Sequence, residues 1–183
     1  MPSSFRNSVI QRAREIWDAR PIFMDTETTG LHNSAEIVEI CLIDHAGEVL
    51  LDALVRPRRP IPLDTMRIHG ITNEMVAQSP TWLQIWPQVE ELLRNRLVGM
   101  YNAEFDQRML QQSHLANGLP WRTPTWQVFD IMKMYTDFSG AWKWQKLEDA
   151  GRQCRIPLPN SHRAKDDTLL TRALFEHMAT SLP

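Results

Sequence analysis

The strongest constraint on the fold of this chain is the order of its apolar, strand-like segments. Residues 21–25 form a short apolar run behind a proline, and residues 37–44 and 48–55 form two further runs separated by His-Ala-Gly, which is typical of a hairpin. Residues 97–102 and 126–132 are later runs that each lead into a helical pattern. Three consecutive strands followed by strand–helix alternation predict an α/β fold, a mixed five-stranded sheet flanked by helices.

Helical periodicity accounts for most of the remaining chain. Apolar residues recur at helical spacing between Ser4 and Trp17, which indicates a helix ahead of the first strand. Pro87 lies inside another helical pattern, so we expect it to kink that helix or to start its second half. Helices or short helical segments are expected at residues 63–72, 81–95, 103–118, 144–154 and 164–178.

Composition is that of an ordinary globular domain. The 183 residues are 43% hydrophobic and 23% charged, and no repeat or linker interrupts them, so we expect one domain over residues 1–183 with residues 1–20 as a helical extension. The apolar runs are too short to span a bilayer, so no membrane association is expected. Cys41 and Cys154 have no CxxC partner and are expected to be free thiols in the cytoplasm.

The charge balance limits how the protein can bind nucleic acid. A net charge of −2 and a pI near 6.3 argue against a protein that coats nucleic acid through bulk electrostatics. Local basic groups can still contact a phosphate backbone, although each one taken singly is more often a solvated surface charge. The candidates are Arg56, Arg58, Arg59, Arg152, Arg155, Arg163 and Lys165. A phosphate-processing site is therefore compatible with this composition.

Four carboxylates and one histidine stand out in three short motifs. Asp25 and Glu27 lie in MDTETTGL at the end of the first predicted strand, where residues two apart share a face. Asp106 lies in YNAEFDQRML, and His162 and Asp167 lie in HRAKDD at the start of the last predicted helix. Carboxylates converging on one sheet edge need counter-charges, and oxygen ligands favour hard cations such as Mg²⁺ or Mn²⁺. Each motif taken singly is equally compatible with a surface turn or a helix cap.

In these motifs the chain resembles the DEDDh-type 3′–5′ exonucleases of the DnaQ-like superfamily, which have a ribonuclease H-like fold. The resemblance runs from about Pro21 to Met178. The H-x4-D spacing of HRAKDD is similar to that of the histidine branch, and RIHGIT at residues 67–72 resembles a further short motif of the family. The second motif often reads His-Asn in the family, whereas this chain has Tyr101-Asn102.

The resemblance implies a two-metal mechanism that releases nucleoside 5′-monophosphates from a 3′ end. Asp25 is then expected to bridge two divalent cations, with Glu27 and Asp167 completing one site and Asp106 holding the other. One ion lowers the pKa of the attacking water and the other stabilises the leaving 3′ oxygen. His162 is expected to accept the proton of the water, since a histidine titrates near neutral pH.

Substrate contacts are also implied by the resemblance. Backbone groups around Thr28 and Leu31 are expected to face the terminal nucleotide. Leu31 and Ile71 are candidates to wedge against the last bases, and ordinary loop packing is an equally good interpretation of both. Asn102 is expected to contact substrate beside Asp106. Trp142 and Trp144, with Lys143 and Lys146, are candidates for base stacking and phosphate contact, although most of the seven tryptophans are expected to be structural.

Several alternatives stay open at this level. We expect a deoxyribonuclease acting in repair or proofreading, with DNA favoured over RNA as the substrate. An exoribonuclease acting on short RNA is the second enzyme hypothesis, because contacts to a 2′-OH are not visible in the sequence. A non-catalytic nucleic-acid-binding module is expected to have lost a carboxylate or the histidine, and all five are present. A polymerase partner and a homodimer contact both stay open.

Overall fold

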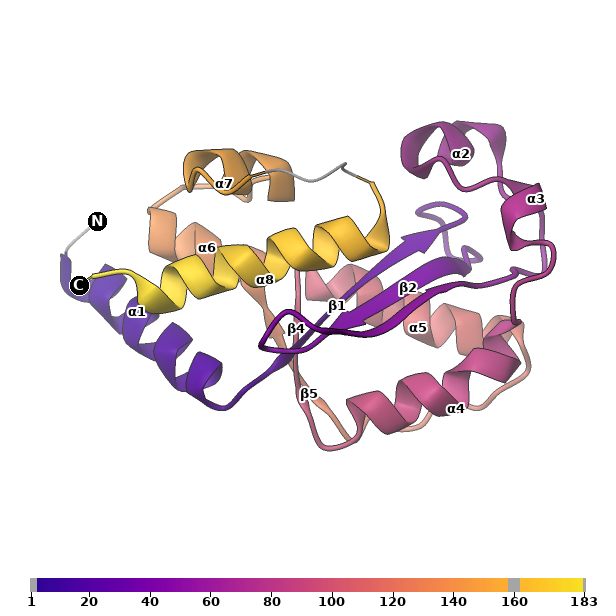
Figure 1. Cartoon of the computed structure of the whole chain (residues 1–183), viewed down its shortest axis with the longest axis horizontal. Coiled ribbons are helices and arrows are strands. Elements are labelled where there is room, and N and C mark those ends of the chain that lie inside the picture. The colour runs from indigo at the N-terminus through magenta and orange to yellow at the C-terminus, as the bar shows by residue number, and fades with distance from the viewer. Residues whose placement is uncertain (1–2, 158–161, 183) are drawn as a thin grey trace.

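The computed structural model describes residues 3–157 and 162–182 and shows an α/β fold built on one five-stranded sheet (Figure 1). The strands are β1 Ile22–Thr28, β2 Ile37–Ile43, β3 Val49–Leu54, β4 Leu97–Met100 and β5 Gln127–Asp130. Their order in the sheet is β3-β2-β1-β4-β5, with β1, β2 and β3 pairing antiparallel and β1, β4 and β5 pairing parallel. The predicted fold class, a mixed five-stranded sheet flanked by helices, is confirmed.

Helices cover both faces of the sheet. They are α1 Ser3–Asp18, α2 Leu63–His69, α3 Asn73–Val76, α4 Trp82–Leu93, α5 Ala103–Ala116, α6 Ile131–Ser139, α7 Leu147–Gln153 and α8 Ala164–Thr180. Helices α4 and α5 pack on one face, whereas α8 lies across the other with α1 and α6 beside it (Figure 1). Helix α4 begins at Trp82 behind a Thr81 capping box and continues through Pro87, so the proline does not start a separate helix.

Side chains of β1 alternate between the two layers. Ile22 and Met24 belong to the apolar cluster formed with α4 and α5, whereas Phe23 belongs to the cluster formed with α1, α6 and α8. This alternation continues past the apolar part of the strand. Asp25 and Glu27 therefore lie on the α8 side of the sheet, and Thr26 lies on the α5 side.

The N-terminal helix is part of this packing. Val9, Ile10 and Ala13 are buried in the cluster between α1 and α8, and Arg14 Nε donates to the Ala179 carbonyl oxygen at 2.9 Å. Across residues 3–157 and 162–182, none of the helices combines the length and apolar character that crossing a bilayer requires.

Candidate catalytic site at the end of β1

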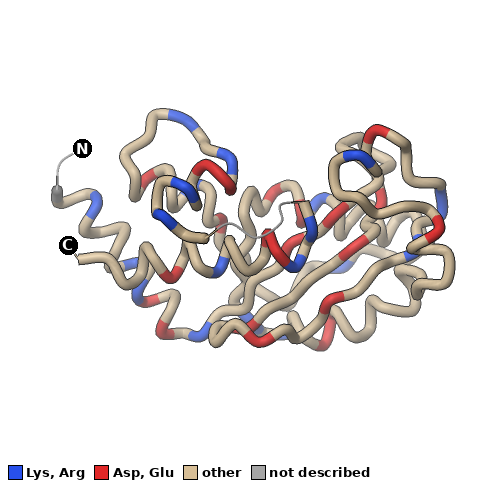
Figure 2. The backbone as a smooth tube through the Cα atoms, turned by 45° about the horizontal axis from the view of Figure 1, so that its top comes forward, with Lys and Arg blue, Asp and Glu red and all other residues tan. Residues whose placement is uncertain are grey.

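Three carboxylates meet where β1 passes under α8. Asp25 and Glu27 come from β1, and Asp167 comes from the first turn of α8. One carboxylate oxygen of each residue lies within 4.8 Å of one from each of the others. Acidic positions gather at the middle of the molecule where β1, β2 and α8 meet (Figure 2). The three side chains are thus arranged so that one cation can contact all of them.

Asp106 approaches the same strand end from the opposite layer. It lies in the first turn of α5 with 2% of its surface exposed, and Thr26 Oγ1 donates a hydrogen bond to its Oδ1 at 2.7 Å. After burial itself, the charge of Asp106 is the largest cause that raises the pKa of Asp25. The strand end is therefore flanked by carboxylates on both of its faces.

Burial raises the pKa of all four carboxyl groups, and repulsion from other members of the cluster adds to it at Asp25 and Glu27. Burial raises the pKa of Asp25 well above its ordinary value, and Asp106, Glu27 and Asp167 add to the effect. Burial, followed by the charges of Asp167 and Glu39, raises the pKa of Glu27 to about 8. The pKa of Asp106 is raised to about 7 by burial, against the hydrogen bond from Thr26. Burial raises the pKa of Asp167 to about 6, partly offset by His162. Arg163 lowers the pKa of Glu27 and His162 lowers that of Asp167, but neither offsets the effect of burial.

His162 stands at the open side of the cluster. Its side chain is 52% exposed, and its Nε2 lies 3.8 Å from Glu148 Oε1 of α7. Its backbone is in the left-handed region, with φ of 67°, two residues before α8 begins. The imidazole is therefore accessible to solvent and lies close enough to Asp167 to affect the pKa of that group.

A buried ion pair joins this loop to the sheet, and sequence reasoning missed it. Glu39 of β2 is 1% exposed, accepts two hydrogen bonds from Arg163 Nε at 3.1 Å and accepts one from the Ala164 backbone N–H at 2.9 Å. Arg163 was expected to contact phosphate, but its guanidinium is held by Glu39. The signal in the sequence is a single charge inside an otherwise apolar strand, since a buried charge requires a partner.

The RIHGIT segment, residues 67–72, holds the backbone at the end of β1 through His69. His69, the last residue of α2, is 4% exposed. Its Nδ1 accepts from the Ile71 N–H at 3.0 Å, which leaves its Nε2–H to donate to the Thr28 carbonyl oxygen at 3.3 Å. Burial lowers the pKa of His69, which favours the neutral ring that this bridge needs. The motif thus fixes the backbone beside the carboxylates.

The four expected substrate contacts have different surroundings. Leu31 is 75% exposed and follows the strand end directly, so it is free to meet a ligand. Asn102 is exposed and sits at the N-cap of α5 in the left-handed region. Thr28 is buried, and its hydroxyl donates to the Gly30 carbonyl oxygen at 2.8 Å. Ile71 is fully buried in an apolar cluster with Val38, Ile61 and Val76, so its expected wedge role is corrected to packing.

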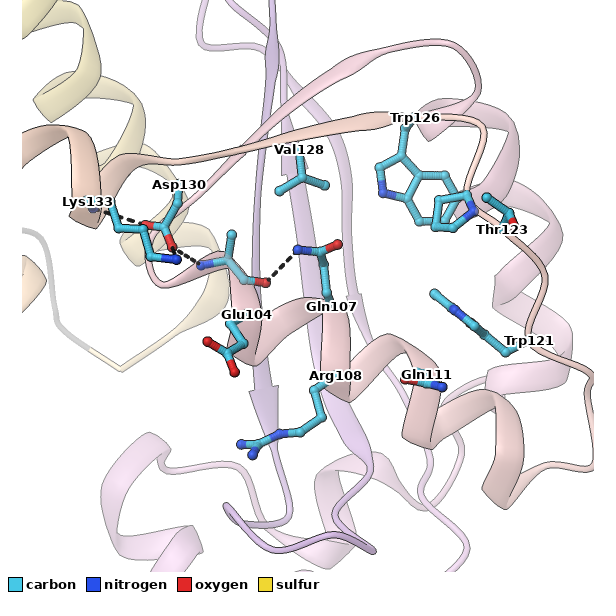
Figure 3. Close-up of a pocket in the computed structure, with 12 residues that line it drawn as sticks. Glu104, Gln107, Arg108, Gln111, Trp121, Thr123, Trp126, Val128, Asp130 and Lys133 are labelled. Carbon is cyan, nitrogen blue, oxygen red and sulfur yellow. Dashed lines mark hydrogen bonds and ion pairs between the residues drawn. The ribbon is translucent and has the colours of Figure 1, made fainter. Parts of the chain in front are cut away.

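A large groove elsewhere on the surface is separate from this site. It has a volume of about 850 Å³ and runs along α5, with Trp121 and Trp126 at one end and Asp130 and Lys133 at the other (Figure 3). Its lining residues, all in the described part of the chain, do not include Asp106 or the other carboxylates of the cluster. The carboxylate cluster is therefore the stronger candidate for chemistry.

Comparisons with known proteins also indicate an exonuclease. The exonuclease family matches residues 22–175. An uncharacterized exonuclease, CP81, of Escherichia phage 186 is 38% identical over 96% of this chain and 97% of its own length. The DNA polymerase III subunit epsilon of Rickettsia felis is 35% identical over 86% of this chain and 73% of its own length.

The fold of this chain is also similar to that of a solved structure. Exonuclease X in complex with 5′ overhanging duplex DNA is 30% identical to this chain, with a TM-score of 0.68, over 87% of this chain and 92% of that protein. Fold, motifs and relatives agree with one another. The chain therefore belongs to the exonuclease family, with the ribonuclease H-like fold of the DnaQ-like, DEDDh-type 3′–5′ exonucleases, and it is a nuclease enzyme.

Proposed function

We propose that this exonuclease hydrolyses DNA from the 3′ end and releases nucleoside 5′-monophosphates, with two divalent cations held by Asp25, Glu27, Asp106 and Asp167. The observation that carries the proposal is the carboxylate cluster at the end of β1, where three side chains from two elements lie within 4.8 Å of one another. Asp106 faces the same strand end from the other layer.

The donor set fits hard divalent cations. All four side chains offer carboxylate oxygens, which suit Mg²⁺ or Mn²⁺. Burial raises the pKa of Asp167, Asp106 and Glu27 to about 6, 7 and 8, so a bound cation would stabilise the ionised carboxylates. Arg163 is held by Glu39 at the edge of the cluster. Two bound cations supply activation of the attacking water and stabilisation of the leaving 3′ oxygen.

The remaining steps fall to side chains of the chain itself. His162 is exposed beside Asp167, so its imidazole is placed to accept a proton from water at neutral pH. Leu31 and Asn102 flank the cluster with exposed side chains and are the proposed contacts to the terminal nucleotide. Thr28 contributes through its backbone, which His69 holds in place.

DNA is the proposed polymer, and repair or proofreading the proposed role. Exonuclease X was solved with duplex DNA, and the epsilon relative is a subunit of a DNA polymerase. A polymerase partner is accordingly part of the proposal. Cys41 and Cys154 are both free thiols, which supports a reducing compartment, and we propose the cytoplasm.

The test is degradation of oligonucleotides labelled at either end. We expect DNA to shorten from its 3′ end with Mg²⁺ or Mn²⁺ and to stay intact in EDTA, and matched RNA to shorten more slowly. Asp25→Asn should lower the rate at least about 10²-fold, because that carboxylate faces all the others. Asp18→Asn, at an exposed acidic position on α1, is the matched control. RNA degraded faster than DNA would assign the exoribonuclease function instead.

A further inference from the structure

The segment between α6 and α7 carries two tryptophans that the fold leaves in solvent. Trp142 is 89% exposed and Trp144 is 66% exposed. The other five tryptophans of the chain are buried or half-buried, and several pack against one another beside α4 and α5. Large exposed aromatic side chains gathered in one place mark binding surfaces more often than packing.

Positive charge is interleaved with these rings. Lys143 and Lys146 lie in the same segment, and Lys143 Nζ lies 5.1 Å from the centre of the Trp142 ring. Among the described residues, neither lysine has a carboxylate within ion-pair distance. The segment rises from the body of the molecule with basic positions along it (Figure 2). Aromatic rings alternating with free cations match a strand of stacked bases on a phosphate backbone.

The segment is attached to the catalytic site. Tyr101, which precedes Asn102 at the end of β4, donates from its hydroxyl to the Gln145 carbonyl oxygen at 2.8 Å. Helix α7 follows the segment directly, and its Glu148 lies 3.8 Å from His162. A groove of about 730 Å³ separates the segment from α7. Tyr101 is the residue that departs from the family's second motif, and its hydroxyl serves here to hold this segment beside the active site.

We propose that Trp142, Lys143, Trp144 and Lys146 form a platform for the single-stranded nucleic acid upstream of the 3′ end, with the tryptophans stacking on bases and the lysines contacting phosphates. This platform rests on the proposed function, since it places the strand whose terminus enters the carboxylate cluster. It predicts that the enzyme binds long strands more tightly than short ones. The terminal nucleotide is held by the cluster, and the nucleotides behind it are held by the platform.

Steady-state kinetics on two substrates of different length separate these contributions. The long substrate is a 12-nucleotide oligothymidylate, and the short one is the p-nitrophenyl ester of thymidine 5′-monophosphate, which has no upstream nucleotides. The double variant Trp142→Ala/Trp144→Ala should raise KM for the oligonucleotide about 5- to 100-fold, the usual range for loss of base stacking. Both kcat and KM for the ester should stay unchanged, because the carboxylates and His162 are intact.

Two further variants serve as controls. Trp142→Phe/Trp144→Phe keeps flat rings and should restore most of the oligonucleotide KM, which a purely structural role for the indoles does not predict. Leu115→Ala removes another exposed apolar side chain, on α5, and should leave both substrates unaffected. Binding of a 5′-fluorescein oligothymidylate, followed by anisotropy in EDTA, tests the platform without catalysis and should weaken in the alanine variant only.

Each outcome bears on one proposal. A wild-type enzyme that degrades no oligonucleotide contradicts the proposed function, while the anisotropy titration still decides the platform. Equal oligonucleotide KM and equal anisotropy in wild type and the alanine variant overturn the platform while leaving the nuclease intact. If the wild-type enzyme is a dimer and the alanine variant is a monomer with an unchanged KM, the tryptophans serve self-association. That result also overturns the platform proposal.

Discussion

At the residue scale, the carboxylates are suited to cation binding and His162 to proton transfer, because the side chains differ in their exposure. Asp106 is almost completely buried, and burial raises the pKa of the carboxyl groups around it, so these groups suit cation binding better than proton exchange with water. His162 is half-exposed, and its Nε2 lies 3.8 Å from Glu148 Oε1. A proton accepted by His162 can therefore pass to solvent directly.

Replacing His162 tests this division. His162→Ala should lower kcat by about 10²- to 10⁴-fold, the usual contribution of a general base, measured on the p-nitrophenyl ester of thymidine 5′-monophosphate. The thermal midpoint should hardly change, because the side chain is largely exposed. His177→Ala, at the other end of α8, is the control and should retain full activity. Turnover close to wild type in His162→Ala would remove the residue from the mechanism.

Some residues of the site could be predicted from the sequence, and others could not. Asp25 and Glu27 were predictable as neighbours because strand alternation is local. Glu39 was not assigned, because its partner Arg163 lies 124 residues away and packing alone brings them together. The choice between a wedge and loop packing at Ile71 stayed open for a similar reason, since the burial of a loop residue depends on the cluster that closes over it.

At the element scale, α8 and β4 set the geometry of the site. Glu39 accepts from the first N–H of α8, so β2 fixes where the helix carrying Asp167 begins. The sequence predicted each strand and α8 because their apolar patterns are long and regular. The course of α4 through Pro87 was harder to predict, because the helix start depends on the Thr81 capping box rather than on periodicity.

Gly99 of β4 allows the close approach of its neighbours. A Cβ at this position would lie 2.6 Å from Phe129 Cζ and 2.9 Å from Ile131 Cδ1. Gly99→Ala should therefore lower the free energy of unfolding by about 1–3 kcal/mol through overpacking, measured by urea denaturation. Phe129→Leu replaces the ring that clashes with a shorter side chain. In a double-mutant cycle, Gly99→Ala should therefore lower the free energy of unfolding less in the Phe129→Leu background. A strictly additive cycle would show that the clash is relieved elsewhere.

At the scale of the whole molecule, the electrostatic repulsion within the carboxylate cluster depends on pH and on bound metal. Without cations, the folded-state pKa values of Asp167, Asp106 and Glu27 are raised to about 6, 7 and 8, above the value of roughly 4 that carboxyl groups have in an unfolded chain. The folded protein therefore holds more protons than the unfolded chain across this interval. Stability that is present below about pH 4 is lost as the pH rises through 6 to 8.

We therefore expect the thermal midpoint in EDTA to fall between pH 5 and pH 8.5, and Mg²⁺ or Mn²⁺ to raise it more at pH 8.5 than at pH 5. Cations compete with protons for the same oxygens and bind only the folded state, so their stabilising effect grows as the protons leave. The formal net charge of −2 at pH 7 keeps general repulsion small near neutral pH. Asp25→Asn removes one buried charge and should flatten the fall in EDTA, whereas Asp18→Asn should leave the slope unchanged. A midpoint in EDTA that is independent of pH would mean that the carboxylates are neutralised within the fold, and that the cluster does not need cations to balance its charge.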